Sequence, residues 1–189
     1  SINSWKDYFY LHTNKNAKDF KICRCKKNQT FKWKDFVPAK NEVLIGGFTM
    51  LKNWMVRAEI INALPKLFVR NLNTNKEEEL IFSKERIYSP GFSITQRNRN
   101  TNLIHLSYSS PKSPGKTYLY NLKTKKKKLI KKQQIPSGHN PNNYIVERLE
   151  CASHDNRKIP ITIIRHKKTK LNGNTNVLLY GYGSYGHSL

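Results

Sequence analysis

The stretch KLFVRNLNTNKEEELIF at residues 66–82 returns in altered form as KTYLYNLKTKKKKLIKK at residues 116–132. The matching positions, at an offset of 50 residues, are Asn71 with Asn121, Leu72 with Leu122 and Thr74 with Thr124. Residues 20–37 have the same pattern of strand, polar turn and strand about 46 residues before the first copy. A period of 40–50 residues with about four short strands is typical of β-propeller blades. One blade cannot bury both of its faces, so blades stack on one another.

The rest of the chain is also divided into short apolar runs. They are the length of strands, rich in β-branched and aromatic residues, and bounded by Asn, Gly, Pro or Lys. Residues 53–64 are the exception, because NWMVRAEIINAL fits either a helix or a strand followed by a turn. The sequence therefore predicts a mainly β fold that contains several propeller blades.

The pattern changes after Lys132. Residues 133–144 form a linker rich in Pro, Gly and Asn, and the residues beyond it alternate like a hairpin whose turn is HDNRK, residues 154–158. The apolar run Val177–Tyr180 predicts a buried strand, as at the opening edge of an α/β sheet. We therefore place a domain boundary between residues 1–138 and 139–189. Because this leaves blades without neighbours, we expect apolar blade faces to be exposed.

Charge is the most unusual feature of the composition. Lys and Arg number 35 against 12 Asp and Glu, a formal net charge of +23. A polyanion such as nucleic acid would suit this charge. However, Lys and Asn are spread along the chain, and no aromatic residue lies among the lysines of residues 123–132. We therefore assign these lysines to a solvated turn and outer strand, and predict no nucleic-acid partner.

Sparse ligand residues argue against a metal site. Cys23 and Cys25 would share one face of a strand, where a disulfide would be strained, and Cys151 is distant in sequence. The six histidines are scattered singly. We expect free thiols, no metal and no cofactor. The chain shows neither a signal peptide nor an apolar run long enough to span a membrane, so we expect a soluble, cytoplasmic protein.

The C-terminal region carries a resemblance to a known family. Residues 144–168, YIVERLECASHDNRKIPITIIRHKK, and residues 176–189, NVLLYGYGSYGHSL, resemble the entry to the catalytic domain in the oligopeptidase B branch of the prolyl oligopeptidase family of serine peptidases. The serine in the YGYGSYG turn favours this branch. The resemblance extends upstream over nearly the whole chain. It implies that residues 1–138 are the last blades of a seven-bladed propeller and that residues 139–189 begin an α/β-hydrolase domain.

The resemblance also assigns one catalytic residue. In the family, the second tyrosine of this turn donates its phenol O–H to the oxyanion, and that position here is Tyr182. Gly181 and Gly183 would let the backbone turn sharply around it. The alternative from spacing alone is a buried aromatic side chain that closes the end of a strand.

The nucleophile, acid and base of the family are missing from this sequence. No Gly-x-Ser-x-Gly elbow occurs, Ser184 lies on the wrong turn, and nothing in the family makes Asp155 or His187 a member of the triad. We therefore expect a truncated or split peptidase, inactive alone, of a family that cleaves short basic peptides after Lys or Arg. A separate C-terminal catalytic chain would be its partner. The alternative is a basic interaction module derived from a propeller.

Overall fold

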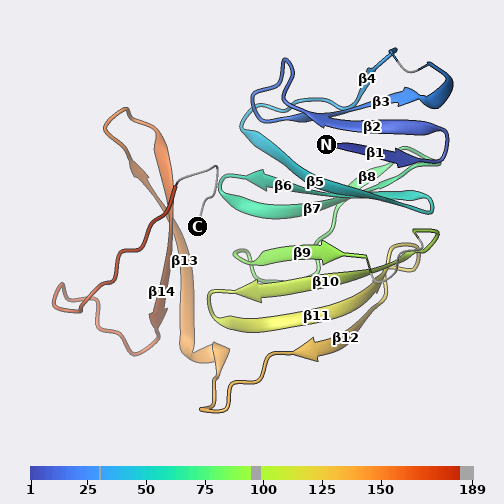
Figure 1. Ribbon diagram of the computed structural model, residues 1–189. Helices are drawn as coiled ribbons and strands as arrows, with labels where there is room; N and C mark the ends of the chain where they lie inside the picture. The colour runs from blue at the N-terminus through green and yellow to red at the C-terminus, as the bar shows by residue number, and fades with distance from the viewer. Residues whose placement is uncertain (30, 95–98, 184–189) are drawn as a thin grey trace.

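A computed structural model describes residues 1–29, 31–94 and 99–183, and the described chain is built almost wholly of β-strands (Figure 1). Three antiparallel four-stranded sheets, here called blades A, B and C, follow one another in chain order and lie one after another in space. Within each blade, strands that are consecutive in sequence are hydrogen-bonded neighbours. This arrangement confirms the predicted fold class, a partial β-propeller.

The strands of the blades are short. Blade A contains β1 (Ile2–Trp5), β2 (Tyr8–Thr13), β3 (Lys21–Lys26) and β4 (Lys34–Val37), with the 3₁₀ turn η1 (Lys27–Gln29) after β3. Blade B contains β5 (Val43–Leu51), β6 (Trp54–Ile61), β7 (Leu64–Asn71) and β8 (Glu77–Glu79). Blade C contains β9 (Ser89–Ser93), β10 (Leu103–Ser110), β11 (Ser113–Asn121) and β12 (Lys127–Lys132).

The ambiguous segment at residues 53–64 is a strand and a turn. It forms β6 and the tight turn into β7, in which Ile61 pairs with Leu64. Asn62 and Ala63 in this turn have φ values of 49° and 56°. Two successive residues with positive φ are typical of the type I′ turn, whose twist matches that of a hairpin. The helical alternative is therefore wrong, because alternate side chains of β6 are needed on the two faces of the sheet.

The internal repeat corresponds to one turn built twice. Asn71 Oδ1 accepts hydrogen bonds from the backbone N–H groups two and three residues further on, at 2.9 and 3.3 Å. Asn121 Oδ1 does the same at 2.9 and 3.1 Å. Each turn then closes through a residue with positive φ, Asn75 or Lys125. The repeated asparagine is thus explained by local hydrogen bonding that starts the turn after β7 and after β11.

The core lies between the blades. One buried cluster joins blades A and B, and a second joins blades B and C. The A–B cluster comprises Tyr10, Ile22, Phe36 and Val37 of blade A with Ile45, Phe48, Met50 and Met55 of blade B. The B–C cluster comprises Leu51, Val56, Leu67, Val69 and Leu80 with Ile104, Leu106 and Leu122. Each blade is therefore stabilised by the apolar area that it buries against its neighbour.

A separate hairpin follows blade C. The linker contains the 3₁₀ turn η2 (Pro141–Asn143) and leads into β13 (Tyr144–Ala152) and β14 (Lys158–His166). The hairpin predicted around residues 154–158 is confirmed, and Figure 1 shows it lying across one end of the stacked blades. No helix among the described residues has the length and apolar character that crossing a membrane requires.

The strand predicted at Val177–Tyr180 is not formed. The side chains of Val177, Leu178 and Leu179 are 85–91% exposed, and residues 174–183 contain no strand. A strand buried in the interior of a sheet needs hydrogen-bonded neighbours on both sides. Among the described residues this segment has none, so the apolar run lies outside any strand and is exposed.

We predict that Ala63→Gly stabilises the protein. A residue with a Cβ is strained at positive φ, and Asn-Gly is the preferred sequence for a type I′ turn. The free energy of unfolding should rise by about 1 kcal/mol, measured by urea denaturation. Ala58→Gly in the middle of β6 is the control, and it should lower stability instead. Equal losses in both variants would contradict the argument from strain.

Candidate functional site

The structure places Tyr182 at the surface. Its side chain is 49% exposed, and its phenol has no hydrogen-bond partner among the described residues. It is therefore not a buried aromatic residue at the end of a strand. A Cβ atom at Gly181 or Gly183 would meet nothing within 4 Å, so in this arrangement neither glycine relieves a steric clash. The role of Tyr182 as an oxyanion donor stays a prediction.

The other residues weighed for catalysis are not assembled into a site. Ser184 and His187 lie outside the described residues. The carboxylate of Asp155 accepts a short hydrogen bond from Ser153 within the turn of the hairpin and pairs with Arg157 at 3.2 Å. The bond from Ser153 lowers the pKa of this carboxyl. Asp155 therefore stabilises its own turn.

Arg148 joins the hairpin to blade B. Its Nη2 atom donates to the backbone oxygen of Asn62 at 2.7 Å, across 86 positions in the sequence. Its Nη1 atom donates to Oγ1 of Thr162, the residue paired with it across the hairpin, at 2.6 Å. The Nε atom is buried and has no partner among the described residues. No sequence pattern had pointed to this contact.

A second contact joins the linker to blade C. Nε2 of His139 lies 2.7 Å from the backbone oxygen of Lys112, in the turn between β10 and β11. The His139 ring stacks on the Tyr144 ring, with 5.4 Å between the ring centroids. Tyr144 also makes a T-shaped contact with His166, with 5.6 Å between the centroids. The turns that receive His139 and Arg148 occupy equivalent positions in blades C and B. The hairpin is therefore attached to the same end of both blades.

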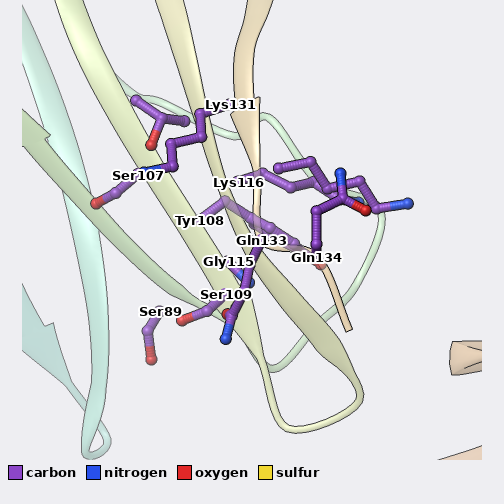
Figure 2. Close-up of a pocket in the computed structure, with 11 residues that line it drawn as sticks. Ser89, Ser107, Tyr108, Ser109, Gly115, Lys116, Lys131, Gln133 and Gln134 are labelled. Atoms are coloured by element: carbon purple, nitrogen blue, oxygen red, sulfur yellow. The ribbon is translucent and has the colours of Figure 1, made fainter. Parts of the chain in front are cut away.

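The outer face of blade C carries a shallow hollow of about 550 Å³ beside the β10–β11 turn (Figure 2). Its lining contains small polar side chains, lysines and the ring of Tyr108. They include Ser89, Ser107, Ser109, Thr117, Lys116 and Lys131. Ser107 lies opposite both Thr117 and Gly91 in the sheet. The residues of β10 that alternate outward here, Ser107 and Ser109, are small and polar. The exposure of apolar blade faces stays a prediction.

A cluster of buried charges lies between blades A and B. The side chains of Arg57 and Glu59 are fully buried. Arg57 donates from both terminal nitrogens to Glu77, at 2.5 and 2.7 Å, and from Nε to Glu59 at 2.8 Å. Lys40 donates to both oxygens of Glu59, at 2.9 and 3.1 Å. Arg70 donates from Nε to Glu77 at 2.8 Å. Each buried charge thus has an opposite charge within hydrogen-bond distance.

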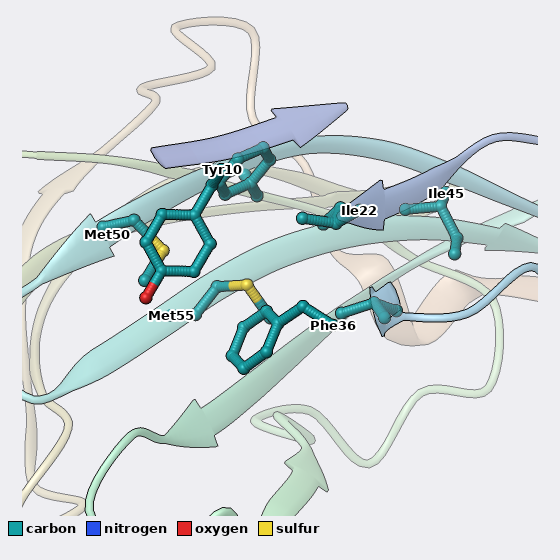
Figure 3. Close-up of a cluster of buried hydrophobic side chains, with 8 residues drawn as sticks. Tyr10, Ile22, Phe36, Ile45, Met50 and Met55 are labelled. Atoms are coloured by element: carbon teal, nitrogen blue, oxygen red, sulfur yellow. The ribbon is translucent and has the colours of Figure 1, made fainter. Parts of the chain in front are cut away.

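The same cluster contacts aromatic rings and blade A. The Arg57 guanidinium lies 5.0 Å from the centre of the Phe68 ring, and that of Arg70 lies 4.7 Å from Phe36. Arg70 also donates to the backbone oxygen of Phe36 in β4, at 2.6 Å. Figure 3 shows Phe36 beside Met55 in the adjoining apolar cluster. Arg70 therefore connects this cluster to blade A, while the ion pairs of Arg57 lie within blade B.

Paired cations set the ionisation of Glu77. Burial by itself raises the pKa of this carboxyl. The hydrogen bonds and positive charge of Arg57, followed by those of Arg70, outweigh burial and hold the pKa below its usual value. Glu77 therefore stays ionised in mildly acidic solution, and its ion pairs are kept.

The cysteines of β3 and the lysines of β12 occupy different surroundings, buried positions in a sheet and an exposed edge strand. Cys23 and Cys25 are free and buried, and burial raises the pKa of Cys23, which donates to Asp35. Among the described residues, no group of three or more His, Cys, Asp or Glu could hold a metal ion. The lysines of β12 lie on an exposed edge strand, as predicted, and Lys125 pairs with Glu78 at 2.7 Å.

Comparison with known proteins matches the propeller. A family model described as prolyl oligopeptidase, N-terminal beta-propeller domain, matches residues 1–133. Dipeptidyl aminopeptidase BI of Pseudoxanthomonas mexicana is 32% identical over 187 residues, which are 97% of this chain and 25% of that protein. Protease 2 of Moraxella lacunata is 24% identical over 185 residues, 98% of this chain and 26% of that protein. The chain thus spans about a quarter of the length of these relatives.

Solved structures agree on the fold. Oligopeptidase B from Trypanosoma brucei, with covalently bound antipain and in a closed form, superimposes with a TM-score of 0.88 at 23% identity. The match covers 98% of this chain and 28% of that one. Oligopeptidase B from Leishmania major gives a TM-score of 0.81 at 18% identity, covering 91% of this chain and 25% of that one.

We predict that Arg57→Met destabilises the protein by about 3 kcal/mol at pH 7, because it leaves the buried Glu59 and the partly exposed Glu77 with fewer partners. The loss should shrink in acid. With its lowered pKa, Glu77 stabilises the fold above the ordinary glutamate pKa of about 4.3, and this contribution is lost as the pH falls through the folded pKa. Thermal unfolding between pH 7 and pH 3 measures both effects.

Arg157→Met is the matched control for Arg57→Met. Its side chain is 83% exposed and pairs only at the surface of the hairpin, so we expect no measurable change. A loss at Arg57 no larger than the loss at Arg157, or one that is constant with pH, would show that the buried cluster does not stabilise the interface.

Proposed function

Because the chain belongs to the prolyl oligopeptidase family, whose N-terminal β-propeller domain matches residues 1–133, we propose that it is the propeller part of a serine peptidase that cleaves short peptides after Lys or Arg. The observation that carries the proposal is this family match, joined to the stacking of three four-stranded blades in chain order. The preference for basic residues rests on the likeness to oligopeptidase B and is the finer part of the proposal.

In this proposal the blades hold the beginning of the catalytic domain. The hairpin β13–β14 resembles the entry to an α/β-hydrolase domain, and Arg148 and His139 attach it to the ends of blades B and C. The contacts are made to backbone oxygens in tight turns of the blades. A catalytic domain that continues from the hairpin would therefore be oriented by the propeller.

Within the reaction, we assign Tyr182 the role of oxyanion donor. A phenol O–H aimed at the developing charge of a tetrahedral intermediate stabilises the transition state more than the bound substrate. The nucleophilic serine, its acid and its base have no candidates among the 189 residues, since the Gly-x-Ser-x-Gly elbow is absent. In the proposed mechanism they belong to a catalytic domain that completes the site.

A second candidate activity is the removal of dipeptides from a free N-terminus. It is favoured by the relative of 32% identity, which is named as a dipeptidyl aminopeptidase. The two activities differ in how they treat the substrate's N-terminus. When the chain is combined with a catalytic domain of the family, hydrolysis of the bond after Arg in N-blocked peptides supports the first activity. Hydrolysis restricted to unblocked peptides supports the second.

We predict that the isolated chain does not hydrolyse peptides with Lys or Arg at the cleavage position, because it lacks the nucleophile elbow. Incubation with a fluorophosphonate probe, followed by mass spectrometry of the whole chain, should show no covalent adduct. An adduct on any serine would overturn this expectation. If no catalytic domain of the family restores activity, the alternative of a basic interaction module gains support.

We also predict that Tyr182→Phe lowers kcat by about 100- to 1000-fold with little change in KM. The assay uses a chimera in which this chain replaces the matching quarter of the dipeptidyl aminopeptidase from Pseudoxanthomonas mexicana. Tyr180→Phe is the control. It also removes a tyrosine hydroxyl, two positions earlier in the chain, and should leave kcat unchanged. Equal kcat values for both variants would limit Tyr182 to a structural role.

A further inference from the structure

The hairpin β13–β14 has no fully buried residue, and its bond to blade B, from Arg148 to Asn62, is polar. Leu149, Ile159 and Ile164 on its two strands are 46–52% exposed, so much of its apolar surface remains in water. By contrast, each blade interface is a cluster of fully or nearly fully buried apolar residues. The hairpin is therefore attached less firmly than the blades are attached to one another.

Two opposing contributions determine the free energy of the contact made by Arg148. Its bond to the backbone oxygen of Asn62 is charge-assisted, which makes it stronger than a bond between neutral groups. The same arrangement buries Nε without a partner among the described residues, and an unsatisfied buried donor carries a penalty of similar size. Moving the guanidinium into water would break the bond and hydrate Nε. The penalty at Nε therefore offsets part of the gain from the bond, and the attached state is favoured over the detached state by the remainder.

Both sides of this contact are rigid. Thr162 holds the second terminal nitrogen of Arg148 from the opposite strand of the hairpin. On the blade, positive φ at Asn62 and Ala63 fixes the direction of the Asn62 carbonyl. A rigid donor that faces a rigid acceptor forms its bond in one orientation of the hairpin. Small rotations of the hairpin therefore break the bond outright.

The linker supplies a point of rotation. It runs from residue 133 to residue 143, between β12 and β13, and Gly138 within it has a φ of 80° with no atom near the position of a Cβ. His139, the next residue, is anchored to the β10–β11 turn of blade C. Rotation about this anchor would move the hairpin away from blade B while the linker stays attached to blade C.

We propose that Arg148 is a latch that reversibly holds the β13–β14 hairpin against the β6–β7 turn of blade B. When the bond to Asn62 breaks, the hairpin swings about the linker at Gly138 and His139. If the proposed function is right, the latch sets the angle between the propeller and the catalytic domain. The latch itself is a property of the 189 residues and does not depend on peptidase activity.

The test measures the distance between the hairpin and the blades in the whole chain. One spin label is attached to Cys151, which is exposed on β13, and a second to cysteine introduced by Lys18→Cys in the exposed β2–β3 turn of blade A. Cys23 and Cys25 are buried and stay unlabelled. In the labelled chain that keeps Arg148 and Thr162, double electron–electron resonance should give one narrow distribution of the distance between the two labels.

Arg148→Met should broaden this distribution or add a second population, while Arg157→Met in the same hairpin should leave it narrow. Thr162→Val keeps the arginine but removes the hydroxyl that orients it, and we expect an intermediate broadening. Thr162→Val also decides the question if Arg148→Met fails to fold. A distribution as narrow as that of the unmodified chain in Arg148→Met, or in Thr162→Val when Arg148→Met is unfolded, would overturn the proposal. Because no substrate is involved, failure here is distinct from failure of the proposed peptidase function.

Discussion

A four-stranded sheet with apolar side chains on its faces cannot be stable alone in water, and the rest of this structure follows from that constraint. Blade B lies in the middle and buries apolar residues on both faces, Met55 toward blade A and Val56 toward blade C. The alternation of side chains along β6 is therefore what joins the three sheets. The repeated turns at Asn71 and Asn121 only need to return the chain for the next strand.

Local features of the sequence predicted the fold well. The turn at Asn71 forms through hydrogen bonds within four residues, so it can be recognised from sequence, and its second copy at Asn121 indicated the blade repeat. The segment 53–64 stayed ambiguous because its apolar residues fit both the helical period of 3.6 residues and the strand period of two. Only the cross-strand partners of β6, which lie elsewhere in the chain, make it a strand.

The contacts that form the candidate site could not be predicted in the same way. Arg148 and Asn62 are 86 positions apart, and the acceptor is a backbone oxygen, which leaves no signature in the residue type. The run Val177–Tyr180 shows the converse case. Its composition predicts a buried strand, but composition does not supply the neighbouring strands that burial requires. The family resemblance, by contrast, came from residues that are local in sequence, and the match over residues 1–133 confirms the family.

The buried charges between blades A and B also constrain how the blades are rotated against each other. Apolar side chains such as Met50 and Met55 tolerate small sliding movements, because dispersion contacts have little directional preference. The directional bond from the guanidinium of Arg70 in blade B to the Phe36 oxygen in blade A does not tolerate such movements. The planar fork of Arg57 on Glu77 lies within blade B and holds Arg70's partner in place. In a ring of repeated units the rotation between neighbours sets the curvature, and any error adds up around the circle. An ionic cluster in this place therefore defines an angular step with a precision that an apolar seam alone would not give.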